Sequence, residues 1–284
     1  MNSLATINFI IEILPSIQAF HSRSSPVYQY LDSLLKPAVE DLFGVNANCN
    51  ADLIDIGNLH FPYFSMGAIN STHLFGLDEL LIFSFYRKNI TRYKTVADLG
   101  ANIGLHSIFL SKLGFTVDSF EPDPEHLKRI EFNINLNNVA PNIIPAAVSL
   151  EDGATEFTRV VGNTTGSHLS GAKDDPYGEL ERFRVQTRAF RTILLEHDLL
   201  KIDVEGHEAN IICSTKPEDW ATSDAILEVG SMTNAERIFN HFKNSDINLF
   251  AQSLSWQKVS SLTDMPSSYK DGSLFISAKV DMPW

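Results

Sequence analysis

Cysteine is scarce in this sequence, and long apolar segments are absent. The two cysteines, Cys49 and Cys213, lie far apart and form no C-x-x-C pattern. This argues against a disulfide framework and against a zinc site, and it is typical of a reducing compartment. The apolar stretch 7–14 is interrupted by Glu12, follows no basic segment and is too short to cross a bilayer. We therefore expect a cytoplasmic protein without a membrane span.

Positive charge is also in short supply. The chain carries 22 Lys and Arg against 35 Asp and Glu, which gives a formal net charge of −13. Because no run of Lys or Arg occurs and an acidic surface repels phosphate backbones, we expect no nucleic-acid partner. Otherwise the composition is that of an ordinary globular protein, with 44% hydrophobic and 20% charged residues, and 284 residues are enough to bury a core.

Prolines divide the first part of the chain. Pro15, Pro26 and Pro37 interrupt helical patterns, and a less regular, aromatic-rich stretch follows at about 53–74. The apolar residues of the segment 7–14 fall at helical spacing, which predicts an amphipathic helix. We predict that residues 1–75 form a helical extension that acts as a lid over the substrate site or as the contact surface of a homodimer.

From residue 95 onward, short apolar runs alternate with helical patterns, which is the signature of a parallel sheet with crossover helices. The expected strands are 95–99, 117–120, 143–148, 199–204, 225–229, 249–254 and 274–278. We predict an α/β domain over residues 76–284, with a doubly wound, mostly parallel, seven-stranded Rossmann-like sheet and an antiparallel edge strand. An insertion at about 151–190 contains two alternating runs, which predict an inserted β-hairpin joined by a loop rich in Gly, Ser and Asp.

The loop after the first expected strand is the first candidate binding site, because ligands of open α/β sheets lie outside the carboxyl ends of the strands. Its sequence is Asp98-Leu99-Gly100-Ala101-Asn102-Ile103-Gly104. Gly100 permits a sharp turn, Gly104 lets the following helix pack tightly, and N–H groups at the helix start face a ligand. The turn is not the pattern G-x-G-x-x-G and offers fewer N–H donors than a pyrophosphate needs, which favours a nucleoside with an amino-acid tail. A generic strand-to-helix turn is the alternative.

The second expected strand ends in Phe120-Glu121-Pro122-Asp123-Pro124. An acidic residue about 20 residues beyond a glycine turn can accept hydrogen bonds from two ribose hydroxyls. We expect Glu121 to do so, because its carboxylate should lie at the tip of the strand. The alternative is a helix N-cap, a position for which Asp123 is the better candidate.

Five segments, in this order and spacing, resemble the FkbM-type methyltransferases: VADLGANIGLHSIFLSKLG, SFEPDPEHLKRIEFNINLNN, AAVSLEDGATEF, LLKIDVEGHEANII and DAILEVGS. The resemblance covers about residues 75–280 and is strongest at 98–104, 121–122 and 201–208. These class I enzymes depend on S-adenosylmethionine, and most of them methylate hydroxyls of macrolides, sugars, glycans and other secondary metabolites.

The resemblance implies S-adenosylmethionine as the cofactor. It places the cofactor on Gly100, Asn102, Gly104 and Glu121, with Ala147-Val148-Ser149 near the adenine. We also count Asp98, Pro122 and Asp203 among the cofactor-binding candidates. One departure stands out: Phe190-Arg191-Thr192-Ile193-Leu194 replaces the usual threonine-leucine-aspartate before the fourth strand, so an expected acidic residue and its local role are missing.

The fourth expected strand leads into Lys201-Ile202-Asp203-Val204-Glu205-Gly206-His207-Glu208. Asp203 lies at the strand end beside the expected methyl position, and Glu205 projects from the same side two residues later. Asp203, Glu205 and His207 are therefore candidates for the general base or for the group that orients an acceptor hydroxyl. The alternatives are that the two carboxylates cap the following helix and that His207 is a surface residue.

Two further catalytic candidates lie on other elements. Glu228 ends the fifth strand, and together with Asp203 it is similar to the paired acidic ligands of magnesium-dependent catechol-type methyltransferases. The resembling family does not generally imply a metal, so we favour a Glu228 that contacts the acceptor and keep a Mg²⁺ site as the alternative. His168, in the inserted loop, is a candidate base because histidine titrates near neutral pH; a polar hairpin turn is the alternative. The remaining histidines of interest are expected to be structural: His60, His73 and His106.

The predicted function is therefore S-adenosylmethionine-dependent O-methylation of a small-molecule or glycan acceptor. One rival is a nicotinamide or flavin enzyme on the same sheet, against which the missing third glycine argues. Another is a catalytically silent nucleoside-binding or assembly domain, against which the intact Asp203, Glu205 and Glu228 speak. The identity of the acceptor depends on segments 1–75 and 151–190, which have the least recognisable pattern, and fold alone does not fix function.

Overall fold

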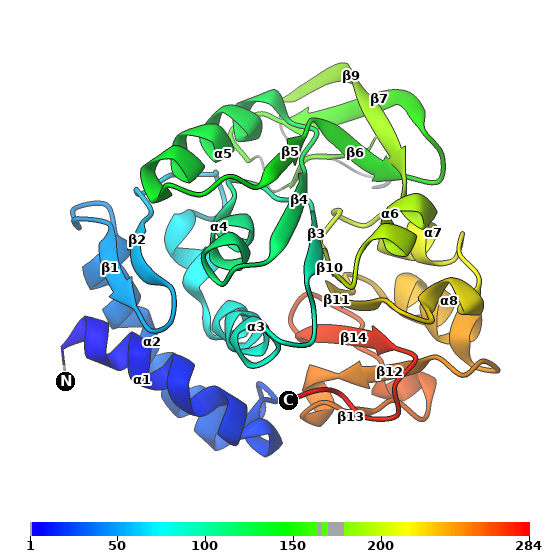
Figure 1. Ribbon diagram of the computed structural model, residues 1–284, viewed down its shortest axis with the longest axis horizontal. Helices are drawn as coiled ribbons and strands as arrows, with labels where there is room; N and C mark the ends of the chain where they lie inside the picture. Colours follow the sequence, from blue (N-terminus) through cyan, green and yellow to red (C-terminus); the bar gives the residue numbers. More distant parts are fainter. Residues whose placement is uncertain (1, 164–165, 170–178) are drawn as a thin grey trace.

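The computed structural model describes residues 2–163, 166–169 and 179–284. An eight-stranded sheet with the order β13-β12-β14-β11-β10-β3-β4-β5 runs through the molecule (Figure 1). Its strands are β3 (Thr95–Leu99), β4 (Thr116–Phe120), β5 (Asn142–Ile144), β10 (Leu199–Ile202), β11 (Asp224–Glu228), β12 (Asn248–Ala251), β13 (Gln257–Lys258) and β14 (Ser273–Ser277). The neighbours from β5 to β11 pair in parallel.

The sheet is more mixed than predicted. Strand β14 is antiparallel but lies inside the sheet, between β11 and β12, and the edge is formed by an eighth strand, β13, which is antiparallel to β12. The prediction of seven strands with a single antiparallel edge strand was therefore wrong in these details. A two-residue strand has too few residues to produce an alternating pattern, and strand order depends on contacts between distant segments.

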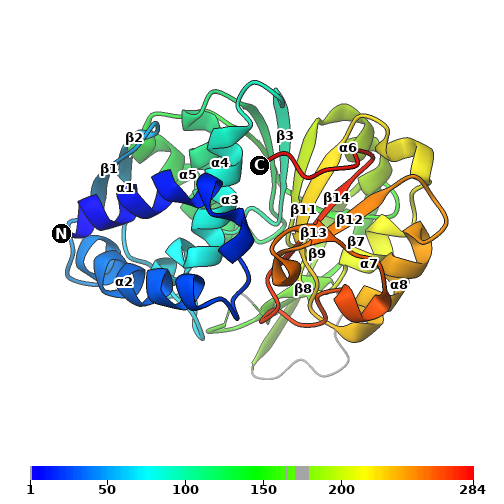
Figure 2. The ribbon, with the colours of Figure 1, turned by 90° about the horizontal axis from the view of Figure 1, so that it is seen from below.

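Helices cover both faces of the sheet. Figure 2 shows α1 to α5 on one side of the sheet and α6 to α8 on the other. The strands of such a sheet are buried on both faces and therefore read as continuous apolar runs, as in β10, where all four residues are buried. The helices that flank the parallel strands are α3 (Leu77–Lys88), α4 (Leu105–Lys112), α5 (Pro124–Asn137), α6 (Phe190–Glu196), α7 (Glu208–Ile212) and α8 (Met232–Phe242).

The first 75 residues pack onto the α3–α4 side of the sheet. They contain α1 (Ser3–Ile13), α2 (Pro26–Phe43) and a hairpin of β1 (Asn50–Leu53) and β2 (Gly57–His60), which the sequence did not reveal. Pro37 lies inside α2 and does not end a helix, whereas Pro26 occupies its first turn. Buried residues of α1 and α2 join the hydrophobic core that α3 and α4 form against the sheet. The segment and the sheet therefore share one core.

The insertion forms a sheet of its own. The expected third strand is broken at Pro145 into β5 and β6 (Ala146–Ser149), because proline lacks the N–H that a central strand position needs. Strand β6 belongs to a second sheet with the order β6-β9-β7-β8, formed with β7 (Gly153–Val160), β8 (His168–Leu169) and β9 (Leu180–Ala189). The predicted hairpin is present as the β7–β9 pair. Most of the loop that joins it, including 164–165 and 170–178, lies outside the described residues.

Within the described ranges, no helix has both the length and the apolar character that crossing a membrane requires.

Candidate cofactor pocket and active site

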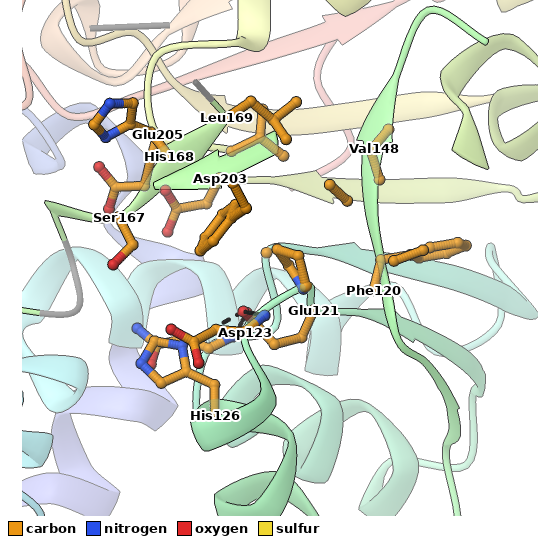
Figure 3. A pocket seen from close by; sticks show the side chains of 17 residues that line it. Phe120, Glu121, Asp123, His126, Val148, Ser167, His168, Leu169, Asp203 and Glu205 are labelled. Atoms are coloured by element: carbon orange, nitrogen blue, oxygen red, sulfur yellow. Dashed lines mark hydrogen bonds and ion pairs between the residues drawn. The ribbon is translucent and has the colours of Figure 1, made fainter. Parts of the chain in front are cut away.

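A cavity opens where β3, β4 and β10 end, and the inserted sheet forms another of its walls. Nine of the predicted site residues line it: Gly100, Asn102, Glu121, Pro122, Ala147, Val148, His168, Asp203 and Glu205. Figure 3 shows Glu121, Asp123 and His126 together in one part of the cavity, with Asp203, Glu205, Ser167 and His168 in another. The topology thus gathers segments that are about 100 residues apart in the sequence. We call this cavity the cofactor pocket.

Gly100 brings the turn after β3 against the end of β10. Its φ is +80°, and a Cβ at this position would lie 1.8 Å from the carbonyl oxygen of Asp203. Asn102 and Gly104 also have positive φ values, 53° and 89°. Gly104 does not line the cofactor pocket; it precedes α4, and a Cβ there would meet Ile130 of α5 at 3.4 Å. This close approach is the tight helix packing that the sequence predicted; contact of Gly104 with a cofactor stays a prediction.

The Glu121 carboxylate fixes the shape of the pocket beneath a bound ligand. Its Oε2 accepts a hydrogen bond from the N–H of Asn102 (2.8 Å), and its Oε1 accepts one from the N–H of Asp123 (2.9 Å). Asp123 is the N-cap of α5, because its Oδ1 accepts from the N–H of Glu125 (2.8 Å). The helix N-cap is therefore Asp123, and ribose binding by Glu121 stays a prediction.

Two polar atoms among the pocket-lining residues are buried and have no hydrogen-bond partner among the described residues: Asn102 Oδ1 and His126 Nε2. A buried polar group without a partner costs free energy, so both atoms are ready to bind polar groups of a ligand. His126 Nδ1 lies 3.5 Å from Glu121 Oε1. Burial alone would lower the pKa of His126, but Glu121 and the nearby Asp123 raise it. The sequence offered one signal for His126, its place in the first turn of α5.

Asp98 is not part of the pocket wall. It is fully buried; its Oδ2 accepts a hydrogen bond from Ser107 Oγ of α4 (2.6 Å), and its Oδ1 lies 3.9 Å from Lys201 Nζ. The motif residue therefore connects β3, α4 and β10 behind the pocket. Its side chain points into the core, and the backbone beyond it forms the turn, so the structure shows a supporting position for Asp98.

The loop after β10 carries Asp203 and Glu205 into the pocket in a strained conformation. Glu205 and Gly206 both have positive φ values, 52° and 96°, and such strain at a non-glycine residue persists only where its surroundings hold it. Glu208 does so: its Oε1 accepts hydrogen bonds from the N–H groups of Gly206 (2.9 Å) and Val204 (3.3 Å). Burial raises the pKa of Glu208. This role of Glu208 was not predicted from the sequence, because the prediction requires knowing that the loop 204–206 folds back onto the Glu208 side chain.

The two histidine candidates, His168 and His207, differ in whether they line the cofactor pocket. His168 is buried in β8, lines the cofactor pocket and has its Nδ1 2.9 Å from the carbonyl oxygen of Gly166, so it belongs to a strand and not to a hairpin turn. The neighbouring Thr164, Thr165 and Ser170 lie outside the described residues. His207 lines no cavity; its Nδ1 accepts a hydrogen bond from Asn210 Nδ2 (3.0 Å), and burial followed by Arg237 lowers its pKa. His207 thus interacts with Asn210 of α7 and Arg237 of α8, and it does not line the cofactor pocket.

Glu228 does not line the cofactor pocket. It lines a second, small cavity of about 10 Å³, which shares Asp203 with the first and also contains Glu79, Lys201 and Ser273. Burial, then Asp203 and Glu79, raise the pKa of Glu228 well above its ordinary value. Within the described residues, no group of three or more His, Cys, Asp or Glu is arranged to hold a metal ion.

A family model matches more than half of the chain. Residues 98–254, more than half of the chain, match the family model described as the methyltransferase FkbM domain. The chain is 24% identical over 166 residues to "Methyltransferase sdnD" of Sordaria araneosa; the match covers 46% of this chain and 64%, less than two thirds, of that protein.

Solved structures with similar folds include a SAM-dependent methyltransferase from Agrobacterium tumefaciens, which is 8% identical, with 81% of this chain and 70% of that one covered and a TM-score of 0.40. An O-methyltransferase from Bacillus cereus in complex with SAH is 10% identical, with 69% and 80% covered and a TM-score of 0.36. The matched family segment runs from the turn after β3 through the loops that form the cofactor pocket and beyond β12. The chain therefore belongs to the FkbM methyltransferase-domain family.

Proposed function

We propose that this protein is an S-adenosylmethionine-dependent methyltransferase that methylates a hydroxyl group of a sugar, glycan or other metabolite. The observation that carries the proposal is the composition of the cofactor pocket. It combines apolar side chains with the Glu121 carboxylate, the two unpartnered atoms of Asn102 and His126, and the acidic residues of the β10 loop. A nucleoside that ends in an amino acid presents matching apolar and polar parts.

The residues present fit this cofactor. Phe120, Val148 and Leu169 supply apolar surface for the adenine, and Ala147 lies on the same strand as Val148. Glu121 stands at the end of β4, where a carboxylate can accept hydrogen bonds from ribose hydroxyls. Its two existing N–H partners fix its orientation before any ligand binds.

Asp203 is the residue best placed to serve the acceptor. S-adenosylmethionine, when bound, would supply a methyl group from its sulfonium and leave as the neutral thioether, and the acceptor hydroxyl would have to give up its proton. Asp203 borders both cavities, so its carboxylate can hold the hydroxyl and accept this proton. Lys201 Nζ, 3.3 Å from Asp203 Oδ2, fixes that carboxylate. Correct positioning alone can contribute about 7–11 kcal/mol to the acceleration of such a step.

Calorimetric titration with S-adenosylhomocysteine and with NAD⁺ tests the cofactor. We expect binding of S-adenosylhomocysteine and none of NAD⁺; binding of NAD⁺ alone would assign the chain to the nicotinamide enzymes. Release of S-adenosylhomocysteine from S-adenosylmethionine in a mixture of sugars and alcohols tests turnover. Asp203→Asn should reduce that rate about 100-fold or more, because general-base catalysis contributes roughly 10²–10⁴-fold. Equal rates for both proteins, with cofactor binding intact, would indicate a silent binding domain.

A further inference from the structure

The second cavity, which we call the acid cavity, adjoins the cofactor pocket at Asp203. It is bounded by α3, β10, β11 and β14. Its apolar walls are Ile82, Ile202, Ile226 and Leu227, and its polar groups are Glu79, Lys201, Asp203, Glu228 and Ser273. Because Asp203 borders both spaces, a group held in the acid cavity would lie next to whatever part of the cofactor reaches Asp203.

The positive charge of Lys201 is already balanced within the protein. Its Nζ lies 3.3 Å from Asp203 Oδ2 and 3.9 Å from Asp98 Oδ1. Burial would lower the pKa of Lys201, but Asp203, Asp98 and Glu79 raise it, so the side chain stays charged. The carboxylates of Asp203 and Asp98 together outweigh the single positive charge of Lys201, so Lys201 offers no net positive charge to a ligand. The acid groups that remain for recognition are Glu79 and Glu228.

Glu79 is held in place as an anion by a buried chain of side chains. Its Oε2 lies 2.9 Å from His106 Nε2, and His106 Nδ1 lies 3.1 Å from the hydroxyl of Tyr86. Burial alone would raise the pKa of Glu79, but His106, Lys201 and Arg23 together lower it. Both His106 and Tyr86 are buried, so the chain is protected from water.

Glu228 differs from Glu79 because no side chain among the described residues holds its carboxylate in place. It makes no hydrogen bond or ion pair with any residue that the structure describes, although it lines the acid cavity. Its side chain is half-buried, and it faces the acid cavity without a protein group to pair with among the described residues. A hydrogen-bond donor in the cavity would supply that partner.

We propose that Glu79 and Glu228 are acceptor-binding residues, and that the acid cavity takes a hydrogen-bond-donating group that is neutral or cationic, such as the hydroxyl or ammonium group of an amino alcohol or amino sugar. An acceptor that presents a carboxylate or phosphate here is excluded, because it would meet the carboxylates of Glu79 and Asp203. His106 and Tyr86 act through Glu79 as positioning residues. This inference rests on the proposed methyl transfer.

Sinefungin provides a probe that does not require the acceptor to be known. In this analogue of S-adenosylmethionine, a carbon that bears a primary amine replaces the sulfonium, so the ammonium group takes the place of the transferred methyl group. Its dissociation constant and that of S-adenosylhomocysteine are measured by calorimetry. We expect the wild-type protein to bind sinefungin about tenfold more tightly, because the ammonium group gains charge-assisted hydrogen bonds.

Glu79→Gln and Glu228→Gln should each reduce this preference about three- to tenfold while the affinity for S-adenosylhomocysteine stays within twofold. The matched control is Glu218→Gln, the same substitution at an exposed residue that lines neither cavity, and it should change neither constant. His106→Gln keeps the Glu79 carboxylate but removes the imidazole 2.9 Å from its Oε2, so it should give a smaller reduction. If Glu79→Gln does not fold, Glu228→Gln carries the test, because it breaks no hydrogen bond within the described residues.

The outcomes separate this inference from the proposed function. Failure of the wild-type protein to bind S-adenosylhomocysteine would refute both. Binding of S-adenosylhomocysteine with no preference for sinefungin, or a preference that survives in both Gln variants, would refute only the acceptor-binding role of Glu79 and Glu228.

Discussion

Gly100 and Asp203 are in such close contact that any Cβ on residue 100 would lie 1.8 Å from the carbonyl oxygen of Asp203. The N–H of Asp203 also donates to the carbonyl oxygen of Leu99 (2.9 Å). The turn that is proposed to bind the nucleoside and the loop that is proposed to bind the acceptor are therefore joined through the backbones of β3 and β10. A displacement of one must displace the other.

Gly100→Ala should accordingly damage both stability and binding. A left-handed φ at a non-glycine residue costs about 1–3 kcal/mol, and the contact with Asp203 forces the two backbones apart in addition. We expect the melting temperature to fall by roughly 4–8 °C, with a loss of about 2 kcal/mol, and S-adenosylhomocysteine binding to fall below detection.

The control is Gly114→Ala, since Gly114 also has a positive φ (92°) but a Cβ there would meet nothing within 4 Å. This variant should lose some stability and keep its affinity. Equal losses of affinity in the two variants would show that the Gly100–Asp203 contact is unimportant for the pocket.

Glu121→Gln tests the link between the glycine turn and the ribose site. The amide keeps one acceptor oxygen but turns an NH₂ group toward one of the two N–H groups, of Asn102 or Asp123, that the carboxylate now accepts from. Hydrogen bonds to charged groups contribute about 1.5–3 kcal/mol each, so affinity for S-adenosylhomocysteine should fall about 10- to 100-fold in calorimetry. Glu125→Gln, an exposed change in the first turn of the neighbouring α5, should leave it unaltered. An unchanged affinity in Glu121→Gln would remove Glu121 from the binding site.

The inserted sheet is fastened to the cofactor pocket by Arg159. Its Nε donates to Asp123 Oδ2 (2.8 Å), and its guanidinium also contacts Glu181. Burial would raise the pKa of Asp123, but the hydrogen bond from Arg159 lowers it, so the pair stays ionised down to acidic pH. Phe157 and His168 of the same sheet line the pocket. The salt bridge therefore connects one wall of the pocket with the loop that bears Glu121.

Arg159→Met should weaken S-adenosylhomocysteine binding about tenfold, because the inserted sheet loses its charged contact with Asp123, and truncating one partner of a buried pair leaves the other uncompensated. Calorimetry measures the affinity. Arg182→Met is the control: it lies on the same sheet, and its ion pair with Glu156 is long (3.9 Å) and exposed. If both variants bind alike, the inserted sheet is not held over the pocket by this pair.

The sequence was informative where the chemistry is local. The turn from Gly100 to Gly104 and the acidic residue at the end of β4 could be predicted, because a strand, a glycine and a strand-end carboxylate are adjacent in the chain. Pro145 could also have predicted the break between β5 and β6, since proline cannot donate in the middle of a strand.

The other half of the site depends on contacts between distant segments. Glu79 reaches the acid cavity from α3, and Arg159 reaches Asp123 from the inserted sheet. Neither residue stands in a pattern that indicates its partner. The partners of His106 could not be predicted for the same reason, because Glu79 and Tyr86 lie 27 and 20 residues away in the sequence. The direction of a buried side chain depends on how distant segments pack together, and the spacing of residues along the chain does not predict that packing.

Glu228→Gln tests the charge state of the acid cavity without any ligand. The folded protein raises the pKa of Glu228 well above its ordinary value, through burial and through Asp203 and Glu79. In the range between the ordinary value of about 4.3 and the raised one, the folded state holds a proton that the unfolded state releases, so this residue makes stability fall as pH rises. Glutamine has a similar shape and no charge to bury.

We therefore expect the free energy of unfolding of Glu228→Gln, relative to wild type, to increase as pH rises from about 5 to 8, at about 1.4 kcal/mol per pH unit at most. Urea denaturation at several pH values measures it, and Glu218→Gln, an exposed change of the same charge, should give a constant difference. A Glu228→Gln difference that is constant or shrinks with pH would mean that Glu228 is ionised in the empty cavity, and that the acid cavity carries a full negative charge from both glutamates before any acceptor binds.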